Sequence, residues 1–166
     1  EIVYKLIPNI DVVIVNYRPD VPYNLGIDYE TLSSINPRLV YVENTAYGRR
    51  GPHSQRPGYD IIIQALSGLM TGDGKILNGV PQQVSATAVA DTSTGLAIAW
   101  GASAALFARE RTGKGQKVEA TLLATALAVQ TMRFLQVDMV DKEPREQFIE
   151  EINALRVAGA SYDDMY

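Results

Sequence analysis

One aspartate with small neighbours precedes a long apolar segment and is the residue best placed for chemistry. Residues 88–95 read AVADTSTG, with Asp91 near their centre, and residues 95–109 read GLAIAWGASAALFAR. An Ala- and Leu-rich run without proline predicts a helix, and an Asp, Ser or Thr just before such a run is typical of a helix start. We therefore expect Asp91 at or beside the N-cap, where the positive end of the helix dipole favours an ionised carboxylate.

The local sequence leaves two interpretations of Asp91 open. Its carboxylate either caps the backbone N–H groups of the first helical turn and does nothing more, or it reacts with a substrate. The second interpretation is sterically allowed because the residues on both sides of Asp91 are small.

Few other residues in the chain could act as nucleophiles or metal ligands. The chain has one histidine, His53, and no cysteine. This composition excludes disulfides and thiolate nucleophiles, and with one histidine it leaves almost no room for a Ser-His-Asp triad or a histidine-ligated zinc site. His53 lies between Pro52 and Ser54, where a solvated loop side chain is expected. We therefore predict carboxylate chemistry without a metal.

The elements that must position Asp91 alternate between strands and helices. The apolar run at residues 11–16 predicts a strand buried on both faces, as in a parallel sheet. A helix over residues 29–35 and a second strand over residues 39–45 follow. Beyond them we predict a helix at residues 60–69, a glycine-rich mobile connection at 68–79, a long helix ending at Thr112-Gly113, a strand at 116–121 and a helix at 122–137.

The first predicted strand delivers three polar residues at its carboxyl end: Asn16, Tyr17 and Arg18. In open α/β sheets, ligands collect at the carboxyl ends of the strands. A guanidinium can hold a phosphate through two parallel hydrogen bonds, so Arg18 is a candidate phosphate ligand. The alternative is that Arg18, which precedes Pro19, is a solvated residue in a turn.

Composition narrows the classes of function. The net charge is −4 with no dense basic cluster, which argues against nucleic-acid binding. The longest apolar stretch, residues 96–108, is shorter than the about 20 residues that span a bilayer, so no membrane association is expected. The absence of cysteine fits a reducing, cytoplasmic location. Because charges rise after Asp138 and Pro144 breaks the chain, we expect residues 1–137 to form one domain and residues 138–166 a polar helical linker or arm.

Several short motifs occur together in one order along the chain. They are DVVIVNYRP at 11–19, INPRLVY at 35–41, RPGYD at 56–60, AD followed by a glycine four residues later at 90–95, and ARERTGKGQ at 108–116. In this order and spacing the segment from about Asp11 to Leu127 resembles CoA-transferase family III. The resemblance implies an α/β fold, a Rossmann-like open parallel sheet with flanking helices that forms part of the family's large domain. Because family members are longer and this chain begins at Glu1, we expect it to be a segment of a longer protein.

The resemblance also implies roles for individual residues. Asp91 stands where the transferases have a catalytic nucleophile, which carries the acyl group and then CoA. Asn16 and Tyr17 stand where the family contacts CoA, with Arg18 as the phosphate ligand, whereas Asn24 replaces an arginine of formyl-CoA transferase. Coenzyme A, as acyl-CoA, and a carboxylic acid are the implied substrates, and an interlocked homodimer is the implied assembly. The family's glycine-rich active-site loop is not recognisable in this sequence.

Tyr59 separates the branches of the family. The racemase branch has a histidine at this place, which exchanges a proton with the substrate together with the aspartate. A phenol has a reference pKa of about 10 and suits hydrogen bonding better than proton abstraction near neutrality. We therefore predict a CoA-transferase with Asp91 and Tyr59 as its catalytic residues. An α-methylacyl-CoA racemase or isomerase and a non-catalytic CoA-binding module are the alternatives.

Overall fold

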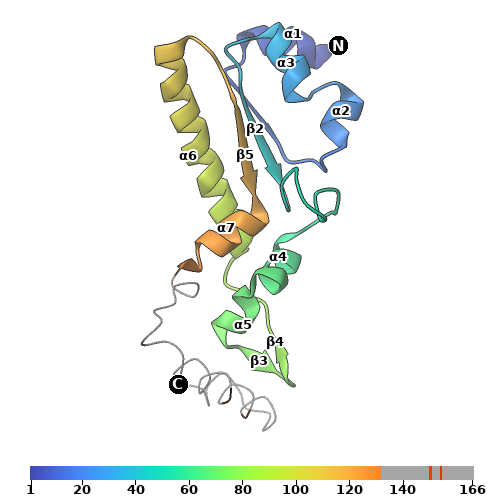
Figure 1. The fold of residues 1–166 in the computed structure, drawn as a ribbon, viewed down its shortest axis with the longest axis vertical. Coiled ribbons are helices and arrows are strands. Elements are labelled where there is room, and N and C mark those ends of the chain that lie inside the picture. The colour runs from blue at the N-terminus through green and yellow to red at the C-terminus, as the bar shows by residue number, and fades with distance from the viewer. Residues whose placement is uncertain (132–149, 151–153, 155–166) are drawn as a thin grey trace.

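A computed structural model describes residues 1–131, 150 and 154 of the chain, and Figure 1 shows its fold. The elements, in order, are α1 (Ile2–Leu6), the 3₁₀ helix η1 (Ile7–Asn9), β1 (Val12–Val15), α2 (Val21–Leu25), α3 (Tyr29–Ile35), β2 (Val40–Thr45), α4 (Asp60–Ser67), α5 (Leu69–Asp73), β3 (Ile76–Leu77), β4 (Val80–Pro81), α6 (Val89–Thr112), β5 (Lys117–Thr121) and α7 (Leu122–Ala128). Within these residues no helix is both long enough and apolar enough to cross a membrane.

Three strands form a parallel sheet in the order β1-β2-β5. Every residue of the central strand β2 is buried. Its side chains alternate between two cores: Val40 and Val42 pack with Ala105 of α6, whereas Tyr41 packs with Leu32 of α3. Helices therefore cover both faces of the sheet, as Figure 1 shows, with α6 on one side and α1 and α3 on the other. The predicted α/β class with a parallel sheet is confirmed.

The edge strand β1 differs from its prediction. It covers Val12–Val15 as expected, but Ile14 is 57% exposed, so β1 is not buried on both faces. The apolar run indicated a strand correctly. It could not indicate how much of each face this chain covers, because that depends on neighbouring elements and not on the run itself.

Two glycines determine where the long helix α6 ends and how closely it packs against β5. It ends at Thr112, and Gly113 adopts a left-handed conformation (φ 70°) in which its N–H donates to the Arg109 carbonyl at 2.8 Å. This confirms the predicted glycine cap. In the middle, a Cβ at Gly101 would lie 2.8 Å from Val118 Cγ1, so glycine allows the helix to approach β5 closely.

A second group of elements lies beyond the carboxyl ends of the strands. Helices α4 and α7 and the start of α6 share a small core of Ile63, Ala90, Leu122 and Ala126. The glycine-rich segment predicted as a mobile connection forms α5 and the β3–β4 hairpin. Asn78 and Gly79 both have positive φ, at 51° and 74°, as a two-residue type I′ hairpin turn requires.

The other predicted elements either lie within the described residues, where their bounds can be compared, or extend beyond them. Helix α3 and strands β2 and β5 lie where expected, α4 ends two residues earlier than expected, and α1, η1 and α2 were not predicted. Helix α7 begins at Leu122 as expected but ends at Ala128, because the chain turns at Val129 and Gln130, so the prediction of one continuous helix over 122–137 is wrong. Residues 132–137 and the predicted arm at 138–166 lie outside the described residues, except for the single positions 150 and 154.

Candidate active site

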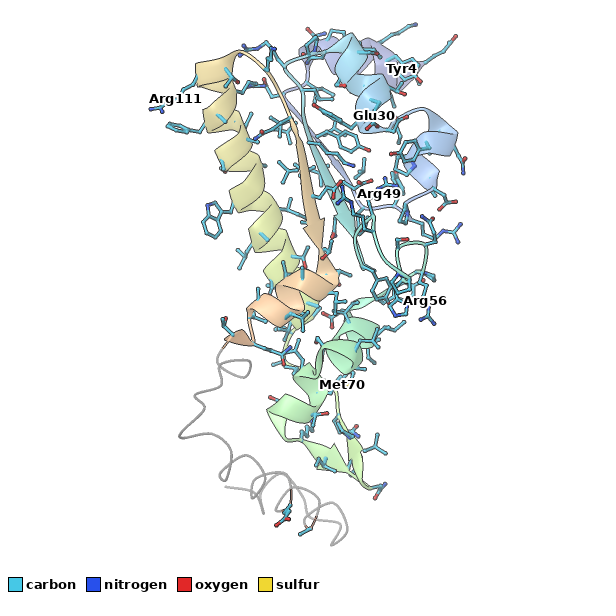
Figure 2. The ribbon with its side chains drawn as sticks, in the orientation of Figure 1. Tyr4, Glu30, Arg49, Arg56, Met70 and Arg111 are labelled. Atoms are coloured by element: carbon cyan, nitrogen blue, oxygen red, sulfur yellow. The ribbon has the colours of Figure 1, made fainter. Side chains whose placement is uncertain are left out.

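A cavity of about 300 Å³ lies at the carboxyl ends of β1 and β2. Its walls are the exit of β1, the end of β2, the loop leading into α4, the first turn of α6 and the first residue of α7. Figure 2 shows Arg56 on that loop, between the sheet above and α4 below. The lining residues are Asn16, Tyr17, Arg18, Pro19, Asn44, Thr45, Ala46, Arg56, Pro57, Gly58, Tyr59, Asp60, Asp91 and Leu122. All five residues that the sequence singled out therefore border one cavity.

The start of α6 differs from its prediction in a way that changes the state of Asp91. The N-cap is Ala88, which contributes no side-chain cap, and Asp91 lies inside the first turn. Asp60 of α4 supplies the cap instead: its Oδ1 accepts the N–H groups of Ala90 at 2.8 Å and of Asp91 at 3.1 Å. Asp91 lies three positions after the N-cap, so the expectation that it sits at or beside the N-cap is wrong, and its carboxylate does not cap the helix.

The carboxylate of Asp91 receives no hydrogen bond from any of the described residues and is exposed toward the cavity. Loss of solvent around it, and then the negative charge of Asp60, raise the pKa of Asp91 above its ordinary value. This direction is opposite to the one expected from the helix dipole, because the first-turn N–H groups are already occupied by Asp60. A carboxylate with few solvating partners and a raised pKa is more basic and more nucleophilic than a capping carboxylate.

Asp60 is the functional residue that the sequence analysis missed. It belongs to the RPGYD motif at 56–60, yet the motif gave no indication that Asp60 bonds to a helix that begins almost thirty residues later. Only the packing of α4 against α6 brings the two together.

The close packing of Gly58 against the end of β2 places the next residue, Tyr59, at the cavity. A Cβ at Gly58 would lie 2.4 Å from Ala46 Cβ, so only glycine allows this loop to pass so close to the end of β2. Tyr59 follows as the N-cap residue of α4 and is 67% exposed. Its hydroxyl has no hydrogen-bond partner within the described part of the chain, so it is free to bond to a ligand in the cavity.

The exit of β1 supplies the opposite wall. The Arg18 side chain is 63% exposed, and its one ion pair with a described residue, to Asp20 at 3.8 Å, is long and solvated, so the pair contributes little to stability. Tyr17 is also exposed. Asn16 Oδ1 accepts a hydrogen bond from Asn44 Nδ2 at 3.4 Å, while the buried Asn44 Oδ1 has no partner among the described residues. These side chains are available to a ligand.

The backbone under this wall is fixed by a buried ion cluster. Arg49 donates to both carboxylate oxygens of Glu43, and its third nitrogen donates to the Pro19 carbonyl at 2.6 Å. Lys117 Nζ lies 2.9 Å from Glu43 Oε2. Burial alone would raise the pKa of Glu43, but the hydrogen bonds from Arg49 and Lys117 lower it below its ordinary value. The ionised cluster therefore ties the β1 exit to β2 and β5.

Two other expectations concern residues away from this cavity. His53 lies in a loop, where its Nδ1 is 3.1 Å from Arg56 Nη1 and its ring packs near Tyr47, and it is not among the lining residues. Asn24, which replaces an arginine of formyl-CoA transferase, is exposed in α2. No group of three His, Cys, Asp or Glu side chains within the described ranges is arranged to hold a metal ion.

The fold and the cavity together define a class of protein: an α/β protein with a cavity at the carboxyl ends of parallel strands, where open sheets of this kind place ligands, and with the Asp91 carboxylate exposed toward it. The family model of CoA-transferase family III matches residues 1–160, and the chain belongs to this family.

The chain is similar to several proteins of known name and structure. An acetyl-CoA:oxalate CoA-transferase of Acetobacter aceti is 40% identical over 75% of this chain and 32% of its own length. A succinyl-CoA:glutarate CoA-transferase of Mus musculus is 40% identical over 78% of this chain and 29% of its own length. A crystal structure of a CAIB/BAIF family protein from Brucella suis aligns with a TM-score of 0.72 at 38% identity, covering 80% of this chain and 35% of that one. This chain thus spans about a third of the length of its relatives.

Proposed function

We propose that this chain carries the reactive carboxylate of a CoA-transferase, which moves CoA between an acyl-CoA thioester and a free carboxylic acid. The observation that carries the proposal is the Asp91 carboxylate, which is exposed toward the cavity without a hydrogen-bond donor while Asp60 caps its helix. Family membership supplies the reaction class, because relatives such as those of Acetobacter and mouse are named as CoA-transferases for oxalate and glutarate.

In the proposed reaction Asp91 is a covalent carrier. One Asp91 oxygen attacks the thioester carbonyl carbon, the carbon–sulfur bond breaks, and CoA leaves as a thiolate. The acyl group is then joined to Asp91 as a mixed anhydride. The thiolate then attacks the Asp91 carbonyl carbon, so that the donor acid leaves as a carboxylate and an aspartyl-CoA thioester remains. The acceptor acid repeats these two steps in reverse, and no proton or oxidant is consumed.

Each tetrahedral intermediate needs a donor for its oxyanion. Aligned backbone N–H groups can supply such a donor, but at the start of α6 those of Ala90 and Asp91 donate to Asp60 and that of Thr92 donates to the Ala88 carbonyl. Tyr59, with its free hydroxyl at the cavity, is the donor that we assign within this chain.

The opposite wall is proposed to bind CoA. Asn16 and Asn44 present amides to the cavity, Tyr17 presents an aromatic face and Arg18 a guanidinium suited to phosphate. The homodimer that the family resemblance implies is part of the same proposal, as is the absence of a metal from the reaction.

The transferase is tested by trapping the carrier. The full-length protein is incubated with an acyl-CoA donor and hydroxylamine, and peptide mass spectrometry is expected to find the hydroxamate on Asp91. A parallel reaction in deuterated water without an acceptor acid measures exchange of the α hydrogen. Rapid exchange without an adduct would favour the racemase, and CoA binding with neither result would favour a non-catalytic module.

A further inference from the structure

A buried glutamine lies directly behind the cap of α6. Gln64 on α4 is 1% exposed, and both ends of its amide are used. Its Nε2 donates to Asp60 Oδ2 at 2.5 Å and lies 3.4 Å from the Val84 carbonyl, while its Oε1 accepts the Val84 N–H at 2.8 Å. A buried amide is tolerated at this position because each of its polar atoms is satisfied.

Asp60 thereby divides its two oxygens between two helices. Oδ1 accepts the N–H groups of Ala90 and Asp91, and Oδ2 accepts the Gln64 amide. A continuous chain of hydrogen bonds runs from Val84, in the segment before α6, through Gln64 and Asp60 to the first turn of α6. Ala88 has no side chain that could cap this turn, and within the described residues Asp60 is the side chain that does so.

We propose that Gln64 is a positioning residue: by fixing the Asp60 carboxylate across the start of α6, its amide holds Asp91 in place at the cavity. The proposal rests on the proposed function of Asp91. Gln64 does not line the cavity and acts through Asp60 alone.

The physical consequence is a loss of alignment. If Asp60 loses its donor, it can rotate or take up a proton, and the N–H groups of Ala90 and Asp91 then lose their acceptor. A displacement of about 1 Å at a reacting group can cost about 100-fold in rate. The CoA-binding wall at the β1 exit shares no hydrogen bond with Gln64, so substrate affinity is expected to be unaffected.

The sharpest variant is Gln64→Glu in the full-length protein. It keeps the oxygen that accepts from the Val84 N–H and replaces the Nε2 donor, which bonds to Asp60 and more weakly to the Val84 carbonyl at 3.4 Å, with a second oxygen. We expect kcat to fall about 10- to 100-fold with KM changed less than about threefold. Gln64→Met, which removes both ends of the amide, is expected to lose at least as much activity.

Gln130 provides a matched control. It is also a buried glutamine, 6% exposed, in the turn after α7, and among the described residues its Nε2 donates to the carbonyls of Ser67 (3.0 Å) and Ala126 (2.9 Å) and not to a carboxylate. Gln130→Glu makes the same chemical change in the neighbouring core without touching Asp60. It is expected to affect melting temperature to a similar degree while kcat stays near the wild-type value.

Acid rescue separates positioning from general loss of structure. At low pH the introduced carboxyl of Gln64→Glu and Asp60 share a proton, so an O–H donor faces Asp60 again and kcat relative to wild type should recover. Gln64→Met should show no such recovery. The other titratable or charged groups around the cap are Asp91 on α6, Tyr59 at the start of α4, Arg56 on the loop and Arg18 after β1; α7 contributes none. All four are unchanged in both variants, so the ratio to wild type isolates the new carboxyl.

Hydrogen exchange at the Ala90 and Asp91 amides gives a readout without turnover. Faster exchange at these two amides in Gln64→Glu supports the proposal if the same two amides in Gln130→Glu remain protected as in wild type. Unchanged kcat and unchanged exchange in Gln64→Glu, or equal losses in the Gln130→Glu control, would overturn it. If exchange changes as expected but wild-type Asp91 forms no adduct, Gln64 still positions the turn and it is the transferase function that fails.

Discussion

The two walls of the cavity are built on different principles. On the Asp91 wall, the side chain of Asp60 on α4 bonds to the backbone of α6, and the Asp91 carboxylate accepts no hydrogen bond from the described residues. On the β1 wall, Arg49 fixes the backbone at Pro19 while Tyr17 and Arg18 remain exposed. The difference fits the proposed division of labour, in which one wall is preorganised for the chemical step and the other offers exposed side chains to CoA.

The largest expected effect that tests this division is at Asp91. Asp91→Asn removes the carrier, and transfer is expected to fall at least about 1,000-fold because no covalent route remains. Its free energy of unfolding should stay at or slightly above that of wild type, since the carboxylate makes no hydrogen bond and lies near the charge of Asp60. Denaturant unfolding with steady-state rates measures both, and substantial activity in this variant would contradict the proposed carrier.

On the other wall, Arg18→Ala is expected to weaken CoA binding about 10- to 100-fold, as for loss of a charged hydrogen bond. Calorimetric titration with CoA measures the loss. The melting temperature should not change because the Asp20 ion pair is solvated. A lowered kcat with unchanged affinity would show that the two walls do not divide binding from chemistry.

Tyr59→Phe sharpens the comparison on the Asp91 wall. The ring is kept and the hydroxyl is lost, so kcat is expected to fall about tenfold or somewhat more if the hydroxyl serves an oxyanion. Because this hydroxyl bonds to none of the described residues, stability should be unchanged. Arg18→Ala is its natural counterpart, for it should raise KM while leaving kcat near wild type.

The smallest expected effect concerns stability against pH. The pKa of Asp91 is raised in the folded protein, so folding is favoured by protonation: this contribution is complete below the ordinary value of 3.8 and is lost as pH rises through the folded pKa. Wild type should therefore gain stability relative to Asp91→Asn as the solution is acidified through that range. Glu43 has the opposite sign, because its stabilising contribution is lost as pH falls below 4.5. Unfolding of both proteins across this range checks the direction.

Sequence patterns predicted those features that depend on neighbouring residues. The apolar runs predicted β1 and β2, and Gly113 predicted the end of α6, because a strand's period and a glycine cap are local properties. The cavity-lining positions of Asn16 and Arg18 followed from the rule that strand ends meet at one edge of a parallel sheet.

Features that depend on distant contacts were not predicted. The start of α6 was misplaced because its cap comes from Asp60 on another helix, and the pKa direction of Asp91 was wrong for the same reason. The exposure of Ile14 depends on what covers β1, and the hairpin at Asn78-Gly79 was hidden by strands of two residues each.

The bonds between Asp60 and the start of α6 also close a loop, which spans 31 residues from Asp60 to Asp91. The entropy of closing a flexible loop grows slowly, by about 0.6 kcal/mol for each doubling of its length. Residues added or removed at the tip of the β3–β4 hairpin would therefore change the closure free energy only slightly. The geometry around Asp91 is therefore expected to tolerate changes in the length of this hairpin, which makes its tip a suitable place for an inserted residue or label.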